Sequence, residues 1–249
     1  MRIDTLDELI AHREARLAVY GGAAYVARYR ALVDAARRAE AGIGSASSGE
    51  RVARAVATTF YRLLAVKDEY EVARLHTDSA FRASLEAQFE GVAGKDFGVK
   101  FNLAPPTLSR PKHGATPVKK TFGQWLWPLL GTMAKFRGLR GTMLDPFGRT
   151  LERRMERELT DDYEVTLQQA FAKLDAGNVE EIVKLADLHA RVRGYGHVKL
   201  ANLAGVKRSE RDLAARLQIA AATGAAVQQA LEEAKGAGTL RGIPVVVAK

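Results

Sequence analysis

The densest group of ionisable side chains lies at residues 67–74, in the run Lys-Asp-Glu-Tyr-Glu-Val-Ala-Arg. In a cleft, the adjacent carboxylates Asp68 and Glu69 could act as the acid and the base of a proton transfer. Neighbours on a helix point about 100° apart, so these two carboxylates would not converge. The spacing instead predicts ion pairs of Lys67 with Glu71 and of Glu71 with Arg74. We therefore expect a structural polar cluster that consists of Lys67, Asp68, Glu71 and Arg74.

No other pattern in the sequence matches a catalytic or cofactor site. The histidines include no pair at i, i+4 spacing, so a zinc-protease motif is absent. His189 and His197 could form a metal pair across the glycine turn between them, but ordinary surface or core histidines are the simpler interpretation. Residues 91–96 resemble a phosphate loop only loosely, because Asp96 stands where Ser or Thr would bind magnesium. The absence of cysteine excludes disulfides, thiolate nucleophiles and iron–sulfur ligation.

The net charge of +9 is concentrated in one segment. Residues 97–144, called the acid-free segment below, contain no Asp or Glu but several cations and both tryptophans. A partner of negative charge should therefore meet this segment first. The candidate interface residues are Arg110, Lys119, Lys120, Trp125, Trp127, Lys135, Arg137 and Arg140.

Three interpretations of the acid-free segment stay open. Cations that alternate with aromatic rings can bind nucleic acid through phosphates and stacked bases, although no fold motif of a nucleic-acid-binding protein accompanies them. The apolar run at residues 125–130 could lie on a membrane surface. The third and preferred interpretation is that the aromatic side chains make core or interdomain contacts and that the cations surround them.

The elements that would position these residues are mainly helices. Ala, Leu, Glu and Arg dominate the composition and aromatic residues make up 7% of it, which favours packed amphipathic helices. The apolar periodicity predicts about seven to nine helices, with a small β element at residues 97–103 and 118–122 and a further β-prone segment at 243–247.

Three parts follow from this pattern along the chain. We expect an N-terminal helical part at residues 1–90, a basic mixed segment with short strands and a Trp-bearing helix at 91–148, and a C-terminal helical part at 149–249. Together they should form one compact domain. The start of the sequence lacks the apolar core of a signal peptide, and the longest apolar run is shorter than the about 20 residues that span a membrane. The expected location is the cytoplasm, without a membrane partner.

Capping residues predict where several helices begin. Thr5 with Glu8, and Ser47 with Glu50, have the spacing of a capping box. Asp78 is expected to cap a later helix.

Other residues predict where helices continue or break. The helix that starts near residue 47 is expected to continue to about residue 75. Gly21 and Gly22 should weaken or kink the first helix, whose pattern resumes after them. Pro128 should interrupt a helix over residues 124–137.

Seven short motifs, taken in order, resemble a known family. They are YVARYR at residues 25–30, KDEYEVARL at 67–75, KFNLAPP at 100–106, KFRGLRGT at 135–142, DPFG at 145–148, ERRMER at 152–157 and RGYGHVK at 193–199. In this order they resemble the C-terminal domain of indolepyruvate ferredoxin oxidoreductase in its long single-chain bacterial form. The resemblance extends over about residues 6–203, most of the chain.

The resemblance implies membership of an enzyme without a catalytic role for this chain. Enzymes of that family oxidatively decarboxylate arylpyruvates and pass electrons from thiamine diphosphate through 4Fe–4S clusters to ferredoxin, with coenzyme A as acyl acceptor. Thiamine diphosphate, magnesium and the clusters are expected in other domains, because this chain has neither the Gly-Asp-Gly motif nor cysteine. No catalytic, cofactor-binding or metal-binding residue is therefore expected here.

The function that the resemblance implies is that of an accessory domain. It would pack on the catalytic domains or subunits of the oxidoreductase, with an acidic ferredoxin as a further partner. The alternative, which follows from the charge alone, is a basic helical module that binds nucleic acid.

Overall fold

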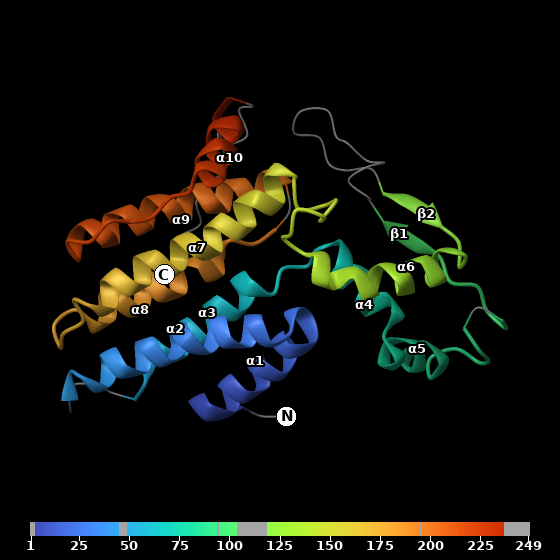
Figure 1. Ribbon diagram of the computed structural model, residues 1–249, viewed down its shortest axis with the longest axis horizontal. Helices are drawn as coiled ribbons and strands as arrows, with labels where there is room; N and C mark the ends of the chain where they lie inside the picture. The colour runs from blue at the N-terminus through green and yellow to red at the C-terminus, as the bar shows by residue number, and fades with distance from the viewer. Residues whose placement is uncertain (1–2, 45–48, 94, 104–118, 195, 237–249) are drawn as a thin grey trace. The chain divides into compact units, whose positions relative to one another are not determined.

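The computed structural model describes residues 3–44, 49–93, 95–103, 119–194 and 196–236 (Figure 1). These residues form ten α-helices, two short strands and two 3₁₀ helices, so the prediction of a mainly α fold with a small β element is confirmed. In chain order they are α1 (Leu6–Gly21), α2 (Ala23–Ala41), α3 (Arg51–Leu64), α4 (Glu69–Thr77), α5 (Ser79–Glu86), β1 (Phe101–Leu103), β2 (Lys120–Phe122), α6 (Leu126–Lys135), η2 (Phe136–Leu139), α7 (Leu151–Phe171), α8 (Val179–Leu188), η3 (His189–Arg191), α9 (Gly196–Arg216) and α10 (Ala225–Gly236).

The chain divides into two compact units. The first joins residues 1–65 to residues 151–249, and the second comprises residues 66–150. This grouping differs from the three consecutive parts expected from the sequence, because the helices before residue 66 pack with those after residue 150.

Three aromatic rings mark the centre of the larger core in the first unit. Phe60 of α3 lies between Tyr29 of α2 and Tyr163 of α7, with ring centroids 6.3 and 5.9 Å away. The hydroxyl of Tyr29 donates to the carbonyl of Ala57 at 3.2 Å and that of Tyr163 to the carbonyl of Ala186 at 2.9 Å. These bonds allow both tyrosines to be buried without an unpaired hydroxyl. Helices α7, α9 and α10 enclose a second, smaller core.

The second unit packs α4 against α6 and a two-stranded hairpin (Figure 1). Strands β1 and β2 are antiparallel, and Phe101 stands opposite Phe122. Ala73, Phe101, Leu126 and Leu130 form the buried centre. Both predicted strands exist but are shorter than expected, and the β-prone segment at 243–247 lies outside the described residues.

The helix starts expected from capping residues are largely confirmed. Thr5 and Glu8 form the predicted capping box, in which each side chain accepts a backbone amide of the other. Asp78 caps α5 by accepting the amide of Ala80 at 2.9 Å. Ser47 lies outside the described residues, and the described helix begins at Arg51.

Two expectations about helix continuity are wrong. The helix expected to reach residue 75 ends at Leu64. A separate helix, α4, begins at Glu69, where Asp68 acts as the N-cap by accepting the amide of Glu71 at 2.8 Å. Pro128 does not interrupt α6, because it lies in the first helical turn, where no amide is needed for an intrahelical bond. The effect of the glycine pair is stronger than the expected kink, since Gly22, with φ +76°, separates α1 from α2.

Candidate functional site

Helix α6 is apolar on two sides, only one of which is buried. Leu126 and Leu130 face the core of the second unit. Trp125, Leu129 and Phe136, spaced by four and seven residues along α6 and its caps, are 63%, 56% and 53% exposed. An apolar helix normally has all its sides covered. In the described part of the acid-free segment, the exposed large apolar side chains of α6 and its caps are therefore all on this second side.

The two tryptophans have different environments. Trp127 is half-buried, donates from Nε1 to the carbonyl of His76 at 3.0 Å and meets Phe101 edge to face at 5.7 Å. The guanidinium of Arg82 lies 5.3 Å from its ring centroid. Trp127 is thus a core side chain, whereas Trp125 contacts Phe122 at its edge and is mostly open to solvent.

Four exposed cations of the acid-free segment form no ion pair with another described residue. Lys119, Lys120, Lys135 and Arg137 are exposed, and within the described ranges none of them is seen in an ion pair. Arg110 lies outside the described residues. An unpaired surface cation keeps its full charge for a partner, so these four side chains make the surface around α6 positive.

Arg140 belongs to the interior of the second unit. It donates to both carboxylate oxygens of Asp68, and the two side chains are 10% and 6% exposed. Its guanidinium also lies 5.8 Å from the ring centroid of Tyr70. Arg140 was predicted to belong to the interface and Asp68 to the polar cluster. The two residues are 72 positions apart in the sequence, so no local pattern predicts that they pair.

The predicted polar cluster is only partly assembled. Glu71 and Arg74 form the expected pair at 2.7 Å, and Arg74 reaches Asp78 at 3.1 Å. The expected pairing of Lys67 with Glu71 across one helical turn is wrong, because α4 begins at Glu69 and exposed Lys67 precedes it.

Asp145 organises the chain after η2. Its carboxylate is buried and accepts the amides of Gly141 at 2.8 Å and Phe147 at 3.0 Å, and the hydroxyl of Tyr70 at 3.1 Å. Burial raises its pKa, but the hydrogen bonds from the amides of Gly141, Phe147 and Gly148 outweigh burial and leave the pKa lowered. Burial, and next the Asp145 charge, raise the pKa of Tyr70 to about 12. Asp145 therefore stays ionised as a structural acceptor at neutral pH.

The first unit contains a buried charged cluster that the sequence reasoning missed. Nζ of Lys207 lies 2.8 Å from Glu210, 3.3 Å from Asp162 and 2.8 Å from the carbonyl of Ala222. Nε2 of His189 lies 3.6 Å from Glu210. A signal for this cluster exists in α9, where a buried stripe places two charged residues at core positions. The stripe consists of Leu203, Lys207, Glu210 and Ala214.

Burial governs protonation in this cluster. Burial, together with the smaller effect of the Lys207 charge, lowers the pKa of His189 to about 3. It raises the pKa of Glu210 against the opposing effect of Lys207. Buried groups with shifted pKa values are candidates for catalysis when they line a cleft. The side chains of His189, Lys207 and Glu210 are each only 1% exposed, so a substrate has no access to them and we assign the cluster a structural role.

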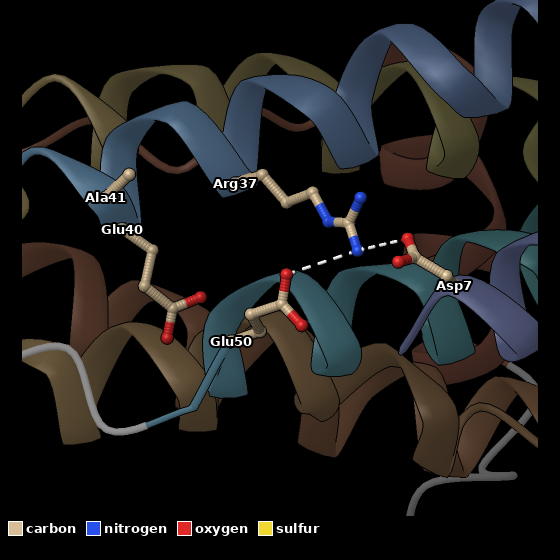
Figure 2. A pocket seen from close by; sticks show the side chains of 5 residues that line it. All are labelled: Asp7, Arg37, Glu40, Ala41 and Glu50. Carbon is tan, nitrogen blue, oxygen red and sulfur yellow. Dashed lines mark hydrogen bonds and ion pairs between the residues drawn. The ribbon is translucent and has the colours of Figure 1, made fainter. Parts of the chain in front are cut away.

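Figure 2 shows a surface hollow lined by Asp7, Arg37, Glu40, Ala41 and Glu50. Arg37 pairs with Asp7 at 2.5 Å and with Glu50 at 3.1 Å. Glu40 is buried and accepts the amides of Val52 and Ala53 at 3.2 and 3.1 Å, the first turn of α3. Its carboxylate thus caps α3 from a different helix. Arg37 thus joins Asp7 and Glu50, and Glu40 is bonded to the start of α3, so we assign these side chains a structural role.

No metal site can be assigned within the described ranges, where no group of three or more His, Asp or Glu side chains is placed to hold an ion. The side chain of His197 is outside the description, so the metal pair of His189 and His197, the less favoured interpretation of these histidines, is not tested. Within the described ranges, no helix combines the length and the apolarity needed to cross a bilayer.

A family of unknown function, DUF6537, matches residues 6–212. The chain belongs to the DUF6537 family. No curated protein and no solved structure matches it.

The DUF6537 match covers both units. It includes the exposed side of α6, the loop held by Asp145, and the buried cluster around Lys207, but it ends within α9 and leaves out α10. The surface around α6 is therefore part of the DUF6537 domain and does not belong to an appended segment.

Proposed function

We propose that this DUF6537 chain is a non-catalytic accessory domain of a cytoplasmic indolepyruvate:ferredoxin oxidoreductase. It acts by packing on the domains or subunits that carry thiamine diphosphate, magnesium and the 4Fe–4S clusters. The proposal rests on the seven ordered motifs that resemble the C-terminal domain of that enzyme. The family match names no function and is neutral on this point.

The observation that carries the packing role is the exposed apolar side of α6. Trp125, Leu129 and Phe136 leave large side chains in water on a helix whose opposite side is already in a core. Aromatic side chains of this kind supply much of the binding energy at protein interfaces. Covering them with another protein would remove an apolar surface that a monomeric protein rarely exposes.

The charge of the acid-free segment indicates what the covering surface should be like. Lys119, Lys120, Lys135 and Arg137 are exposed and unpaired in the described part of the chain. A partner surface with carboxylates at its edge would be complementary to them. An acidic ferredoxin has the same sign of charge and is a further candidate partner of this surface.

Co-purification tests the proposal. The polypeptide from the same organism that carries the Gly-Asp-Gly and cysteine motifs is co-expressed with a tagged copy of this chain. We expect the two to co-purify, and we expect Trp125→Ala to raise the Kd by about 10-fold or more. Phe89→Ala is the matched control, because Phe89 is an exposed aromatic residue of the same unit outside the acid-free segment. Failure of the wild-type chain to bind this polypeptide would show the proposal to be wrong.

A second measurement distinguishes the proposed function from the alternative, nucleic-acid binding. The observation that favours this alternative is the exposed ring of Trp125 in a segment with unpaired cations. Binding to a single-stranded oligonucleotide should fall steeply with ionic strength if phosphates contact these cations. Salt-dependent binding that Trp125→Ala weakens, together with no binding to the enzyme polypeptide, would favour that alternative.

A further inference from the structure

A short loop between η2 and α7 presents two apolar side chains to solvent. Met143 is 88% exposed and Leu144 is 77% exposed, the largest values among the large apolar side chains in the described ranges. Single exposed apolar residues are common on protein surfaces. Two adjacent ones at the tip of one loop are of interest when the loop itself is held in a fixed shape.

Buried groups hold both ends of this loop. At its start, Arg140 pairs with the buried carboxylate of Asp68. At its end, Asp145 is buried and accepts both the hydroxyl of Tyr70 and the amide of Gly141, which closes the loop at 2.8 Å. Gly141 has φ +73°, a conformation that other residues adopt only with strain.

Hydrogen bonds also order the backbone between these ends. The hydroxyl of Thr142 donates to the carbonyl of Leu139 at 2.7 Å and accepts the amide of Leu144 at 3.3 Å. The guanidinium of Arg149 donates to the carbonyl of Met143 at 3.0 Å. The backbone that carries the two apolar side chains is therefore arranged before any partner arrives.

We infer that Met143 and Leu144 are anchor residues that insert into an apolar pocket on a protein partner, and that carboxylates at the rim of that pocket meet Arg137 and Arg149. The identity of the partner rests on the proposed function. Arg137 and Arg149 are both exposed and lie on either side of the tip in sequence. The acid-free segment offers no carboxylate that would repel an acidic rim, and the carboxylate of Asp145 is buried within the unit.

The fixed shape of the loop favours a protein partner over a membrane. A lipid surface accepts apolar side chains in any conformation. A pocket of defined shape binds a loop more tightly when the loop is already in its bound conformation, because less conformational entropy is lost on binding. The buried carboxylates and the left-handed Gly141 that hold this loop thus serve a shape-specific contact.

Substitution of the anchors tests the inference with the full chain. We expect Met143→Ser and Leu144→Ser each to raise the Kd for the enzyme polypeptide described above by about 10-fold. Val92→Ser, an exposed apolar position of the same unit, should leave the Kd within about twofold and serves as the control. Circular dichroism would show that each variant keeps the helical content of the wild type.

The outcomes separate this inference from the proposed function. If the wild-type chain binds and the anchor variants bind equally well, the inference is wrong and the proposed function stands. If the wild-type chain does not bind, both are wrong. If the anchor variants lose binding to vesicles of phosphatidylcholine and phosphatidylserine but not to the polypeptide, the tip is a membrane contact and the inference is also wrong.

A second variant tests the role of loop shape. Tyr70→Phe removes the hydroxyl that donates a hydrogen bond to Asp145, and it leaves every exposed side chain of the tip in place. We expect faster amide exchange at Gly141 and a rise in Kd of about threefold, smaller than that of the anchor variants. Faster exchange with an unchanged Kd would show that the fixed shape does not contribute to binding.

Discussion

Replacement of His189 by leucine should make the stability of the first unit less sensitive to acid. Burial, aided by Lys207, lowers the pKa of His189 from 6.5 to about 3 in the folded chain. Between these values the unfolded chain binds a proton at His189 and the folded chain does not. The contribution of His189 to the free energy of unfolding of the wild type is therefore fully present above pH 6.5. It is lost as the pH falls toward 3.

The size of the effect follows from the shift. Each pH unit below 6.5 lowers the free energy of unfolding by about 1.4 kcal/mol, so acidification to about pH 5 costs about 2 kcal/mol. His189→Leu removes this loss and keeps a similar side-chain volume. Glu210 does not disturb the comparison, because burial and the charge of Asp162 raise its pKa against the lowering effect of Lys207 and Arg211, and His189 is not among the causes of the shift.

Urea unfolding followed by circular dichroism, at about pH 7.5 and about pH 5, provides the measurement. The pH-induced loss of stability should be about 2 kcal/mol larger in the wild type than in His189→Leu. His12→Gln is the control, and we expect it to change the pH dependence much less, because His12 is half-exposed. An equal loss in the wild type and in His189→Leu would refute the reasoning. It would mean that protonated His189 is accommodated beside Glu210, 3.6 Å away.

Three further predictions concern buried charge. Lys207→Met leaves two buried carboxylates without their cation and should lower the free energy of unfolding by about 3–5 kcal/mol in urea titrations; a loss below about 1 kcal/mol would contradict the ion-pair assignment. Glu40→Gln should cost about 1–2 kcal/mol by weakening the cap of α3, while exposed Glu50→Gln should cost less than about 0.5 kcal/mol. Asp68→Asn should cost about 3 kcal/mol by breaking the pair with Arg140, and tryptophan fluorescence will report it because both tryptophans lie in the second unit; equal midpoints for variant and wild type would be evidence against it.

Local patterns predicted the features that depend on neighbouring residues. The capping box of Thr5 and Glu8, the cap at Asp78 and the pair of Glu71 with Arg74 each involve residues within four positions. Such interactions are set by helical geometry and do not depend on the rest of the fold. The two short strands also followed from local alternation, although the pairing shortened them to the residues that face each other.

Long-range partners explain what the sequence could not predict. From the sequence alone, Arg140 looks like a cation on the surface. In the structure it is buried in an ion pair with Asp68, which lies far away in the sequence. Glu40 caps a helix that starts eleven positions later, across a connection whose sequence suggested a different cap. In both cases the partner is chosen by packing, and a charged residue at such a position looks like any other until the elements are in place.

The discontinuous first unit has a consequence for how the chain folds. Residues 1–65 share their core with helices that follow residue 150, so during synthesis the aromatic ring of Phe60 lacks Tyr163 as a neighbour for about a hundred residues. The contiguous second unit emerges whole within that interval and can complete its own contacts first. A chain cut short before α7 would therefore contain a finished insert, attached to three N-terminal helices whose apolar sides are open to aggregation.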